Sequence, residues 1–381
     1  MLASDLRIAL FSGNYNYVRD GANQALNRLM GSALAAGAAV RVYSPTIATP
    51  AFPPTGDLVS VPSWSMPGGR GEYRLARGLP DAVRADLEAY RPNIVHVSAP
   101  DILGHRAVSW AHAQGIATIA SLHTRFETYP RYYHLGFTEP LLVWAQKRFY
   151  NRVDQVMVPS QSMVTLLREW GVSSPIGVWS RGINHARFNP GRRDEAWRRA
   201  LGIAEHEVAV GFLGRLVLEK GLGVFADVVA ALKARGVPHK VLVIGDGPAR
   251  EWFARRVPEA AFTGFQAGDD LGRAVAGMDI FFMPSVTETF GNVTTEAMAA
   301  GVPVVAARAT GSVDLVVDGV TGFLVPPQDV SAYADAIQRL IEDPALRRAA
   351  GLASHERVRG YEWEEVNADM LKAYEALAHK A

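Results

Sequence analysis

The sequence predicts an α/β protein with two domains, each built around a parallel sheet. Short apolar runs alternate with helical patterns rich in Ala and Leu, and this alternation produces right-handed crossovers between parallel strands. The alternation occurs twice, and a stretch rich in Gly, Pro and Arg at 177–193 separates the two parts. The length of 381 residues also exceeds what one compact core accommodates and suits two domains.

The strand predictions follow the apolar runs in order. In the first half these runs are 6–12, 40–44, 58–61, 94–98, 116–122 and 155–159. In the second half they are 208–213, 240–245, 279–284 and 302–307, with shorter candidates at 261–265 and 322–326. The Pro-, Gly- and Ser-rich residues 45–75 have little periodicity, so we expect irregular structure there with at least one short strand.

These runs set the domain boundaries that we expect. We expect residues 1–176 to form a first α/β domain, 177–193 a linker and 194–360 a second α/β domain. The amphipathic helix predicted for 361–381 either caps its own domain or returns to the first.

Composition excludes several classes of protein. Hydrophobic residues make up 49% of the chain and charged residues 20%, as in a globular protein with a large interior. The chain has no cysteine, which excludes disulfides and thiolate metal sites and favours a reducing, cytoplasmic location. No signal peptide or membrane-spanning run is predicted. The net charge is only +1, and the basic residues are not concentrated in one stretch of the sequence. Both observations disfavour a nucleic-acid partner.

The most informative stretch is 281–307, which contains FFMPS, VTETFGNVTTEAMAAG and VPVVAA. Glu288 follows a predicted strand, Gly291 and Asn292 make a turn, and Glu296 lies in the opening turns of a helix. A helix N-terminus attracts anions, and carboxylates accept hydrogen bonds from sugar hydroxyls. The combination suits a sugar nucleotide at the carboxyl edge of the sheet. The alternative, in which Glu288 caps the turn and Glu296 is only solvated, has equal weight from these residues alone.

A second motif, GRLVLEKGL, follows the run at 208–213. Its Arg215 and Lys220 could neutralise a diphosphate without a metal ion. The alternative, two charges on a solvated loop, is much weaker because Glu288 and Glu296 are expected on the same sheet edge. Gly245 lies in another glycine turn, IGDGPAR, on the same edge. The loop G-x-x-x-x-G-K-[ST] is absent, which argues against ordinary ATP or GTP hydrolysis.

The first crossover contains Gly13 and Gly21, which permit close backbone approach to a ligand. The fingerprint G-x-G-x-x-G is absent, so a dinucleotide cofactor loses its main support. His123 directly follows the run at 116–122 and therefore lies at the ligand-binding edge, although a lone histidine is more often structural.

Residues 125–152 interleave basic and aromatic side chains. This pattern suits an anionic membrane surface, but it equally suits a helix pair whose aromatic rings lie in the core. The residues concerned are Arg125, Arg131, Lys147, Arg148 and Arg152 with Phe126, Tyr129, Tyr132, Tyr133, Phe137, Trp144, Phe149 and Tyr150.

Taken together, these segments resemble the retaining glycosyltransferases of family 4, which have the two-domain GT-B architecture. The most specific match is E-x7-E, from Glu288 to Glu296 within TETFGNVTTEAMAAGVPVVA. GRLVLEKG, VPSQSMVTLLREWGV, RGINHARFNP and SVDLVVDGVTGFLVPPQD follow the family pattern as further segments. The resemblance implies an α/β GT-B fold, with two Rossmann-like domains whose parallel sheets face each other across a cleft.

The resemblance also implies an activity. A hexose of the glucose, mannose or glucuronic acid type would pass from a UDP- or GDP-sugar to a hydroxyl acceptor, giving an α-glycoside without a cofactor or metal. HTRFETYPRYYHLGF is most similar to segments of enzymes that glycosylate membrane lipids, including sulfoquinovosyl-, glucuronosyl- and mannosyl-lipid synthases. A lipid or lipid-linked glycan acceptor, and a peripheral place on the inner face of the plasma membrane, are therefore expected.

Matching positions imply residue roles. Arg215 and Lys220 hold the diphosphate, Glu288 contacts the transferred sugar, Glu296 holds the ribose hydroxyls, and His123 lies near the reacting sugar. The catalytic set is His123, Arg215, Lys220 and Glu288. The donor-binding set is Gly21, Gly214, Arg215, Lys220, Gly245, Glu288, Phe290, Gly291, Asn292, Val293 and Glu296. The acceptor-binding set is Asn14, Tyr15, Asp20, Arg125 and Tyr129, and it is weakened because Asp20-Gly21-Ala22-Asn23 stands where the family often has paired glycines.

Two other functions and one mechanistic alternative remain open at this point. A sugar-nucleotide epimerase of the same architecture would change the donor without any acceptor, and a non-catalytic module would bind the donor and transfer nothing. Retention requires either a nucleophilic carboxylate on the far face of the sugar or a front-side route. No nucleophile stands out, which favours the front-side route, although Glu288 could act as one.

Overall fold

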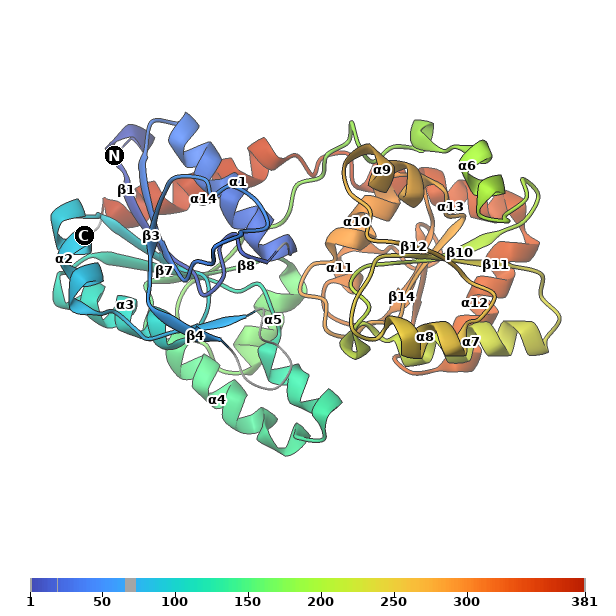
Figure 1. The fold of residues 1–381 in the computed structure, drawn as a ribbon, viewed down its shortest axis with the longest axis horizontal. Helices are drawn as coiled ribbons and strands as arrows, with labels where there is room; N and C mark the ends of the chain where they lie inside the picture. The colour runs from blue at the N-terminus through green and yellow to red at the C-terminus, as the bar shows by residue number, and fades with distance from the viewer. Residues whose placement is uncertain (1, 19, 66–72, 380–381) are drawn as a thin grey trace. The chain divides into compact units, whose positions relative to one another are not determined.

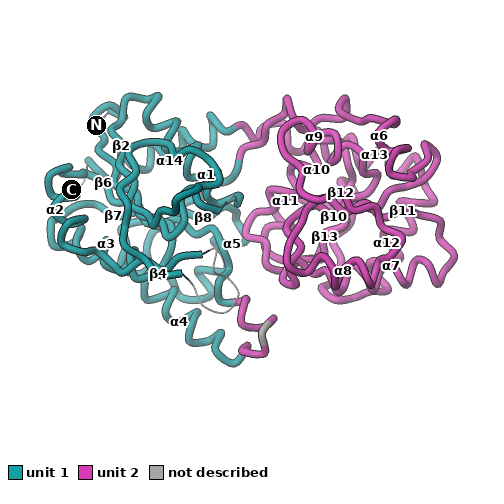
Figure 2. Tube along the Cα trace, in the orientation of Figure 1, with its two compact units in different colours: residues 1–127, 137–181, 363–381 teal, residues 128–136, 182–362 magenta. Residues whose placement is uncertain are grey.

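The computed structural model describes residues 2–18, 20–65 and 73–379. The chain divides into two compact units, shown in different colours in Figure 2. Unit 1 comprises residues 1–127, 137–181 and 363–381, and unit 2 comprises residues 128–136 and 182–362. The main division therefore falls inside the stretch expected to be a linker, and the short segment 128–136 groups with unit 2.

Unit 1 is built on a seven-stranded parallel sheet in the order β3-β2-β1-β6-β7-β8-β9. Six strands match the predicted runs, and the seventh, β9, comes from residues whose apolar pattern is too short to indicate a strand. The strands are β1 Arg7–Phe11, β2 Ala39–Ser44, β3 Asp57–Ser60, β6 Ile94–Val97, β7 Ala117–Ser121, β8 Gln155–Val158 and β9 Ile176–Val178. Within 45–75, β4 (Ser63–Ser65) pairs antiparallel with β5 (Arg74–Ala76).

Helices cover both faces of this sheet (Figure 1). On one face lie α1 (Gly21–Ala35) and α14 (Trp363–Ala378), which are neighbours in space although they come from opposite ends of the chain. Their buried side chains share one core with the middle of the sheet. The opposite face is covered by α2 Asp81–Tyr90, α3 Ile102–Ala113, α4 Glu139–Tyr150 and α5 Gln161–Glu169. Single turns of 3-10 helix lie at Ala3–Asp5 and Gly136–Thr138, and a longer 3-10 segment spans Phe126–Tyr133.

Unit 2 contains a six-stranded parallel sheet in the order β12-β11-β10-β13-β14-β15. All six predicted runs of the second half are strands. They are β10 Ala209–Leu213, β11 Lys240–Ile244, β12 Ala261–Gly264, β13 Ile280–Met283, β14 Val304–Ala307 and β15 Gly322–Val325. Both central strands are completely buried, as expected for a parallel sheet covered on both faces.

The helices of unit 2 also form two layers. One face carries α7 Leu222–Ala234, α8 Arg250–Arg256 and α12 Val330–Glu342. The other carries α9 Gly268–Ala276, α10 Asn292–Ala299, α11 Ser312–Leu315 and α13 Pro344–Arg357, with α6 Glu195–Ala200 beside them. Short 3-10 turns lie at Pro190–Arg192 and Leu218–Lys220.

In both sheets the strand order reverses next to the first strand of the unit, between β1 and β6 and between β10 and β13. Open α/β sheets bind ligands at the carboxyl ends of the strands at such a reversal. In unit 2 the loops that leave this point are those of the two predicted motifs. No helix in the described part of the chain is long and apolar enough to cross a membrane.

Candidate functional site

The structure brings Lys220 and Glu288 into direct contact. Lys220 ends the 3-10 turn after β10, and Glu288 lies on the loop after β13. The Lys220 Nζ donates to Glu288 Oε1 across 2.6 Å. The Glu288 side chain is only 10% exposed, so the ammonium supplies charge compensation that water cannot fully provide. The same loop is anchored because Thr310 Oγ1 donates to the Glu288 carbonyl across 2.9 Å.

The exposed Arg215 lies on the loop that also carries Lys220, directly after Gly214. Backbone hydrogen bonds tie this loop to the one after β11. The Gly214 amide donates to the Ile244 carbonyl, and the Leu216 amide donates to the Asp246 carbonyl. Gly245 has φ +133°, and a Cβ there would lie 2.0 Å from the Gly214 oxygen. Only glycine permits this close approach, which explains the glycine turn in the sequence.

The first turn of α10 supplies backbone donors beside this pair. Gly291 precedes the helix with φ 109°, in the left-handed region, and no side chain caps the helix start. The first amides of a helix, here those of Asn292 and Val293, have no partner within the helix and therefore suit an anion. Phe290 is buried and packs against Tyr361, with ring centroids 5.9 Å apart. This packing anchors the turn to the protein interior.

Glu296 lies on the second turn of α10 and is half-buried. Its carboxylate makes no hydrogen bond to any residue that the structure describes. Burial raises the pKa of Glu296 to about 8, and nearby Arg187 opposes the rise. A half-buried carboxylate without a hydrogen-bond donor suits a ligand that brings hydroxyl groups, because these would replace the lost hydration.

Unit 1 contains the remaining predicted site residues except Tyr129. His123 lies just after β7, and both of its ring nitrogens are hydrogen-bonded, to Arg181 and to Ser121. Asp20 caps α1, since its Oδ1 accepts from the Asn23 amide across 2.8 Å. Asn14 donates to the same carboxylate across 3.4 Å, and Gly21 is the first helical residue.

The acceptor-binding prediction is wrong for the side chain of Tyr15. Its ring is fully buried in the core beneath α1, and its hydroxyl donates to the Thr55 carbonyl across 2.7 Å. Arg125 also has an internal partner, the buried Glu127, at 2.8 Å. Tyr129 lies in segment 128–136, which groups with unit 2.

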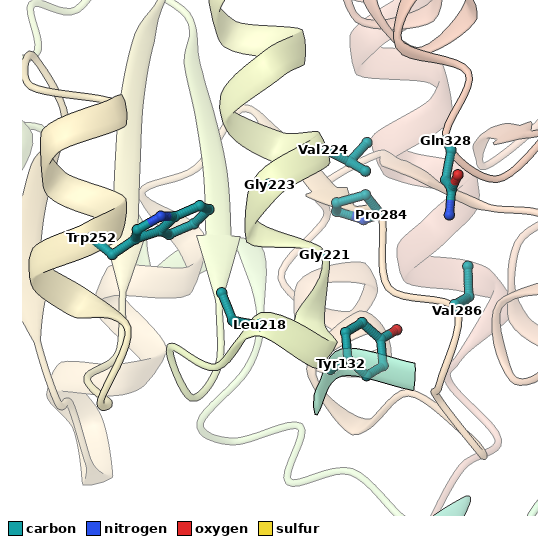
Figure 3. Close-up of a pocket in the computed structure, with 9 residues that line it drawn as sticks. All are labelled: Tyr132, Leu218, Gly221, Gly223, Val224, Trp252, Pro284, Val286 and Gln328. Atoms are coloured by element: carbon teal, nitrogen blue, oxygen red, sulfur yellow. The ribbon is translucent and has the colours of Figure 1, made fainter. Parts of the chain in front are cut away.

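An apolar pocket of about 250 Å³ in unit 2 adjoins the loop of Lys220. Figure 3 shows the ring of Trp252 at one end, Gln328 at the other, and Val224 and Pro284 between them. Gly221 follows Lys220, and its closeness to Pro284 brings the loops after β10 and β13 together at this place. The pocket is lined by Tyr132, Leu218, Gly221, Gly223, Val224, Trp252, Pro284, Val286 and Gln328.

The sequence prediction missed two arginines near these sites. Arg187, whose charge acts on Glu296, and Arg181, which contacts His123, both lie in the stretch interpreted as a linker. The segment RGINHARFNP was recognised as a family segment, but its spacing does not indicate which side chains turn inward. No group of three or more His, Asp or Glu residues within the described ranges could hold a metal ion.

Comparison with known proteins places this geometry in a family. Residues 19–187 match the family model described as Glycosyltransferase Family 4, and residues 207–343 match that of Glycosyl transferases group 1. A GDP-mannose-dependent alpha-mannosyltransferase of Corynebacterium glutamicum is 32% identical over 77% of this chain and 70% of its own length. The chain belongs to glycosyltransferase family 4. The resemblance seen in its motifs is therefore confirmed.

Other relatives agree with this family. A GDP-mannose-dependent alpha-mannosyltransferase of Mycobacterium tuberculosis is 31% identical over 82% of this chain and 78% of its own length. The sulfoquinovosyl transferase SQD2 of Arabidopsis thaliana is 33% identical over 76% of this chain, although the match spans only 58% of that longer protein. This family 4 protein is a hexosyltransferase that uses a nucleotide-sugar donor.

Solved structures confirm the GT-B fold. Sucrose-phosphate synthase from Thermosynechococcus elongatus superposes with a TM-score of 0.81 at 24% identity, covering 99% of this chain and all of that one. WaaG, a glycosyltransferase involved in lipopolysaccharide biosynthesis, superposes with a TM-score of 0.71 at 17% identity, covering 97% and 99%.

Proposed function

We propose that this glycosyltransferase transfers a hexose from GDP-mannose, or a related UDP- or GDP-sugar, to a hydroxyl of a membrane lipid or lipid-linked glycan, with retention. The observation that carries the proposal is the Lys220–Glu288 contact at the strand-order reversal of unit 2, beside the uncapped start of α10. The mannosyltransferase names of two relatives support mannose as the first sugar to test.

On the donor side, breaking the anomeric bond leaves negative charge on the diphosphate. Arg215, Lys220 and the first amides of α10 are the groups that would stabilise it, and they would do so most strongly as the charge develops. Lys220 has three donor hydrogens, so its bond to Glu288 leaves capacity for a phosphate oxygen. Arg215 and Lys220 would thus neutralise the negative charge of the diphosphate without a metal ion.

The geometry also favours the front-side route to retention. Glu288 Oε1 already accepts a charge-assisted bond from Lys220, which reduces the nucleophilicity of that carboxylate. A carboxylate in this position suits accepting a hydroxyl of the transferred sugar better than attacking its anomeric carbon. The leaving phosphate would then remove the acceptor proton. Trapping a covalent sugar on Glu288 would overturn this route.

The lipid acceptor is supported by an apolar stripe on unit 1, which comprises Phe137, Leu141 and Trp144. These side chains are 79%, 63% and 57% exposed, respectively. Leu141 and Trp144 are three positions apart on α4 and therefore share one face, and Phe137 lies in the 3-10 turn directly before this helix. The Arg148 guanidinium lies 6.0 Å from the Trp144 ring centroid. Exposed apolar groups with an adjacent cation suit the headgroup level of an anionic membrane, which would place the protein peripherally on a cytoplasmic leaflet.

The activity test incubates the full chain with GDP-mannose, UDP-glucose or UDP-glucuronate, with and without a lipid extract containing free hydroxyl headgroups. We expect a new α-linked glycolipid, identified from its anomeric proton coupling, with one of these donors. A changed sugar on the donor without any acceptor would instead indicate an epimerase. Tight donor binding with no transfer to any extract would indicate a non-catalytic module.

The membrane test measures co-sedimentation with vesicles of phosphatidylglycerol and phosphatidylcholine at low and high salt. We expect L141S/W144S to bind at least about tenfold more weakly, since the two side chains would bury apolar area in the lipid. The matched control is L352S, which changes a side chain that is 71% exposed on α13 of unit 2. Equal binding of both variants would contradict the role of the stripe.

A further inference from the structure

A buried chain of hydrogen bonds runs through unit 1 from the C-terminal helix to His123. The Tyr374 hydroxyl on α14 is 2.6 Å from His96 Nδ1, and His96 Nε2 is 2.7 Å from Ser121 Oγ. Ser121 Oγ is in turn 2.8 Å from His123 Nε2, and Arg181 Nη2 is 2.8 Å from His123 Nδ1. All members except His123 are nearly inaccessible to water. The chain joins β6, β7 and α14, which are far apart in the sequence.

Arg181 lies at one end of this chain of hydrogen bonds, and its guanidinium determines the donor and the acceptor of each bond. A guanidinium can only donate, so His123 Nδ1 accepts and the ring proton lies on Nε2, where it is donated to Ser121 Oγ. The Ser121 hydroxyl then donates to His96 Nε2, and His96 Nδ1–H donates to the Tyr374 oxygen. The two histidines therefore have opposite tautomers. Burial keeps both rings neutral, because it lowers the pKa of His96 to about 3 and, together with Arg181, that of His123 well below its usual value.

Trp179 fixes the same group from the side. Its ring meets the His123 and His96 rings edge-on, at centroid distances of 5.6 and 6.4 Å. The Arg181 guanidinium stacks over this indole at 4.6 Å and also donates to the Trp179 carbonyl across 2.8 Å. The imidazole of His123 therefore cannot rotate without breaking a buried bond, since each ring nitrogen has a partner.

We propose that Arg181, Ser121, His96 and Tyr374 are positioning residues that fix the tautomer and orientation of His123, so that the turn after β7 meets the reacting sugar in one geometry. In this proposal His123 is an anchor of the turn and carries no proton between acceptor and donor, because both of its nitrogens are already bonded. The C-terminal helix thereby contributes to the active site through Tyr374. The proposal rests on the function proposed above and on the family resemblance, which implies that His123 lies near the reacting sugar.

The proposal gives a kinetic pattern that a purely structural role would not. Apart from Gly21, the residues predicted to bind the donor lie in unit 2, whereas this chain of bonds lies in unit 1. Y374F and S121A should therefore lower kcat about tenfold, because a small misplacement of a reacting group is costly, while GDP affinity stays within about twofold. S121T keeps the hydroxyl and should recover most of the lost turnover.

The matched control is Y333F. Tyr333 is also a fully buried tyrosine, but in unit 2, and its hydroxyl has no hydrogen-bond partner among the described residues. We expect Y333F to leave kcat unchanged. Full turnover in both Y374F and S121A would overturn the positioning role, and so would an equal loss of turnover in Y333F. If H123A loses turnover while Y374F and S121A keep it, the positioning role is rejected but His123 still belongs to the active site. If H123A keeps full turnover, His123 does not belong to the active site.

A second measurement does not depend on turnover. Nitrogen-15 NMR of histidine-labelled protein, assigned with H96Q and H123Q, reports the tautomer of each ring. We expect His123 protonated at Nε2 and His96 protonated at Nδ1 across pH 6–8, with the His96 signal shifted in Y374F. Finding His123 protonated at Nδ1, or either ring charged at pH 7, would overturn the proposal even if no donor or acceptor were known.

Discussion

The environment of Glu296 gives the most direct test of the donor site, through the substitution Glu296→Gln. Burial raises the pKa of this carboxyl from the ordinary 4.5 to about 8. Between these values the folded protein holds a proton that the unfolded chain has released. Stability therefore falls as pH rises through this window and is lowest above pH 8. Gln cannot ionise, so E296Q removes the loss.

The magnitude follows from the same values. Each pKa unit corresponds to about 1.4 kcal/mol, which sets an upper limit of about 5 kcal/mol for a change from 4.5 to about 8. Glu296 is half-buried, so water reduces the penalty, and we expect about 2 kcal/mol. For a unit of this size, a gain of about 2 kcal/mol in the free energy of unfolding raises the Tm of E296Q by about 4–8 °C at pH 8.5. At pH 4.5 we expect almost no rise in Tm.

The assay is a thermal shift series from pH 4.5 to 9, with the exposed Glu205→Gln as control. A Tm difference between E296Q and the native chain that does not change with pH would refute the reasoning. The ligand side can be checked by calorimetry with GDP. If ribose hydroxyls bind the ionised carboxylate, the native affinity should rise about tenfold from pH 7 to 9, whereas that of E296Q should stay constant. This range lies above the phosphate titration near pH 6.

Three further substitutions test other parts of the site. R215A should lower kcat about a hundredfold, or about 3 kcal/mol, and full turnover would reject its role on the diphosphate. K220M should cost about 1–2 kcal/mol of stability, because it leaves Glu288 buried without its partner, and E288Q in the same chain should restore most of it in chemical denaturation. G245A should lower both Tm and GDP affinity, since its Cβ would meet the Gly214 oxygen at 2.0 Å, whereas G236A, with a positive φ and open space around it, should affect Tm alone.

Much of unit 2 could be predicted from the sequence because its determinants are local. The strand, the Gly291 turn and the helix that ends before Gly301 are specified within one short stretch, and the structure has α10 there, with Gly301 at φ +76°. The contact between Lys220 and Glu288 instead depends on the strand order, because it joins the loops after two strands that are neighbours in the sheet. The residues that were missed depend on contacts between distant segments. Tyr374 reaches His96 across 278 positions of sequence, and no periodicity reveals such a bond.

Unit 1 shows that polar and aromatic residue types in a loop can have structural partners. Tyr15 and Asp20 lie in a loop after the first strand, where polar and aromatic residues suggest ligand contacts. Tyr15 instead holds the loop to the Thr55 carbonyl, and Asp20 caps α1. Both are fixed by the need to satisfy polar groups near a core, a need that a sequence pattern does not distinguish from binding. Both contacts help to fix the conformation of this loop.

The two glutamates of the E-x7-E motif differ in a way that bears on how the donor binds. Glu288 has the ammonium of Lys220 at 2.6 Å, so its burial is compensated before any ligand arrives. Glu296 has no hydrogen-bond donor among the residues that the structure describes, and burial raises its pKa to about 8. A ligand that donates hydroxyls to Glu296 therefore relieves a cost present in the empty protein, whereas one that contacts only Glu288 competes with Lys220. The nucleoside portion of the donor should therefore supply more of the binding free energy than the sugar portion. We expect GDP alone to bind almost as tightly as the intact donor, and mannose 1-phosphate to bind far more weakly. Calorimetry with GDP, the intact donor and mannose 1-phosphate at pH 8.5 measures these affinities. Tighter binding of mannose 1-phosphate than of GDP would contradict the different roles assigned to Glu288 and Glu296.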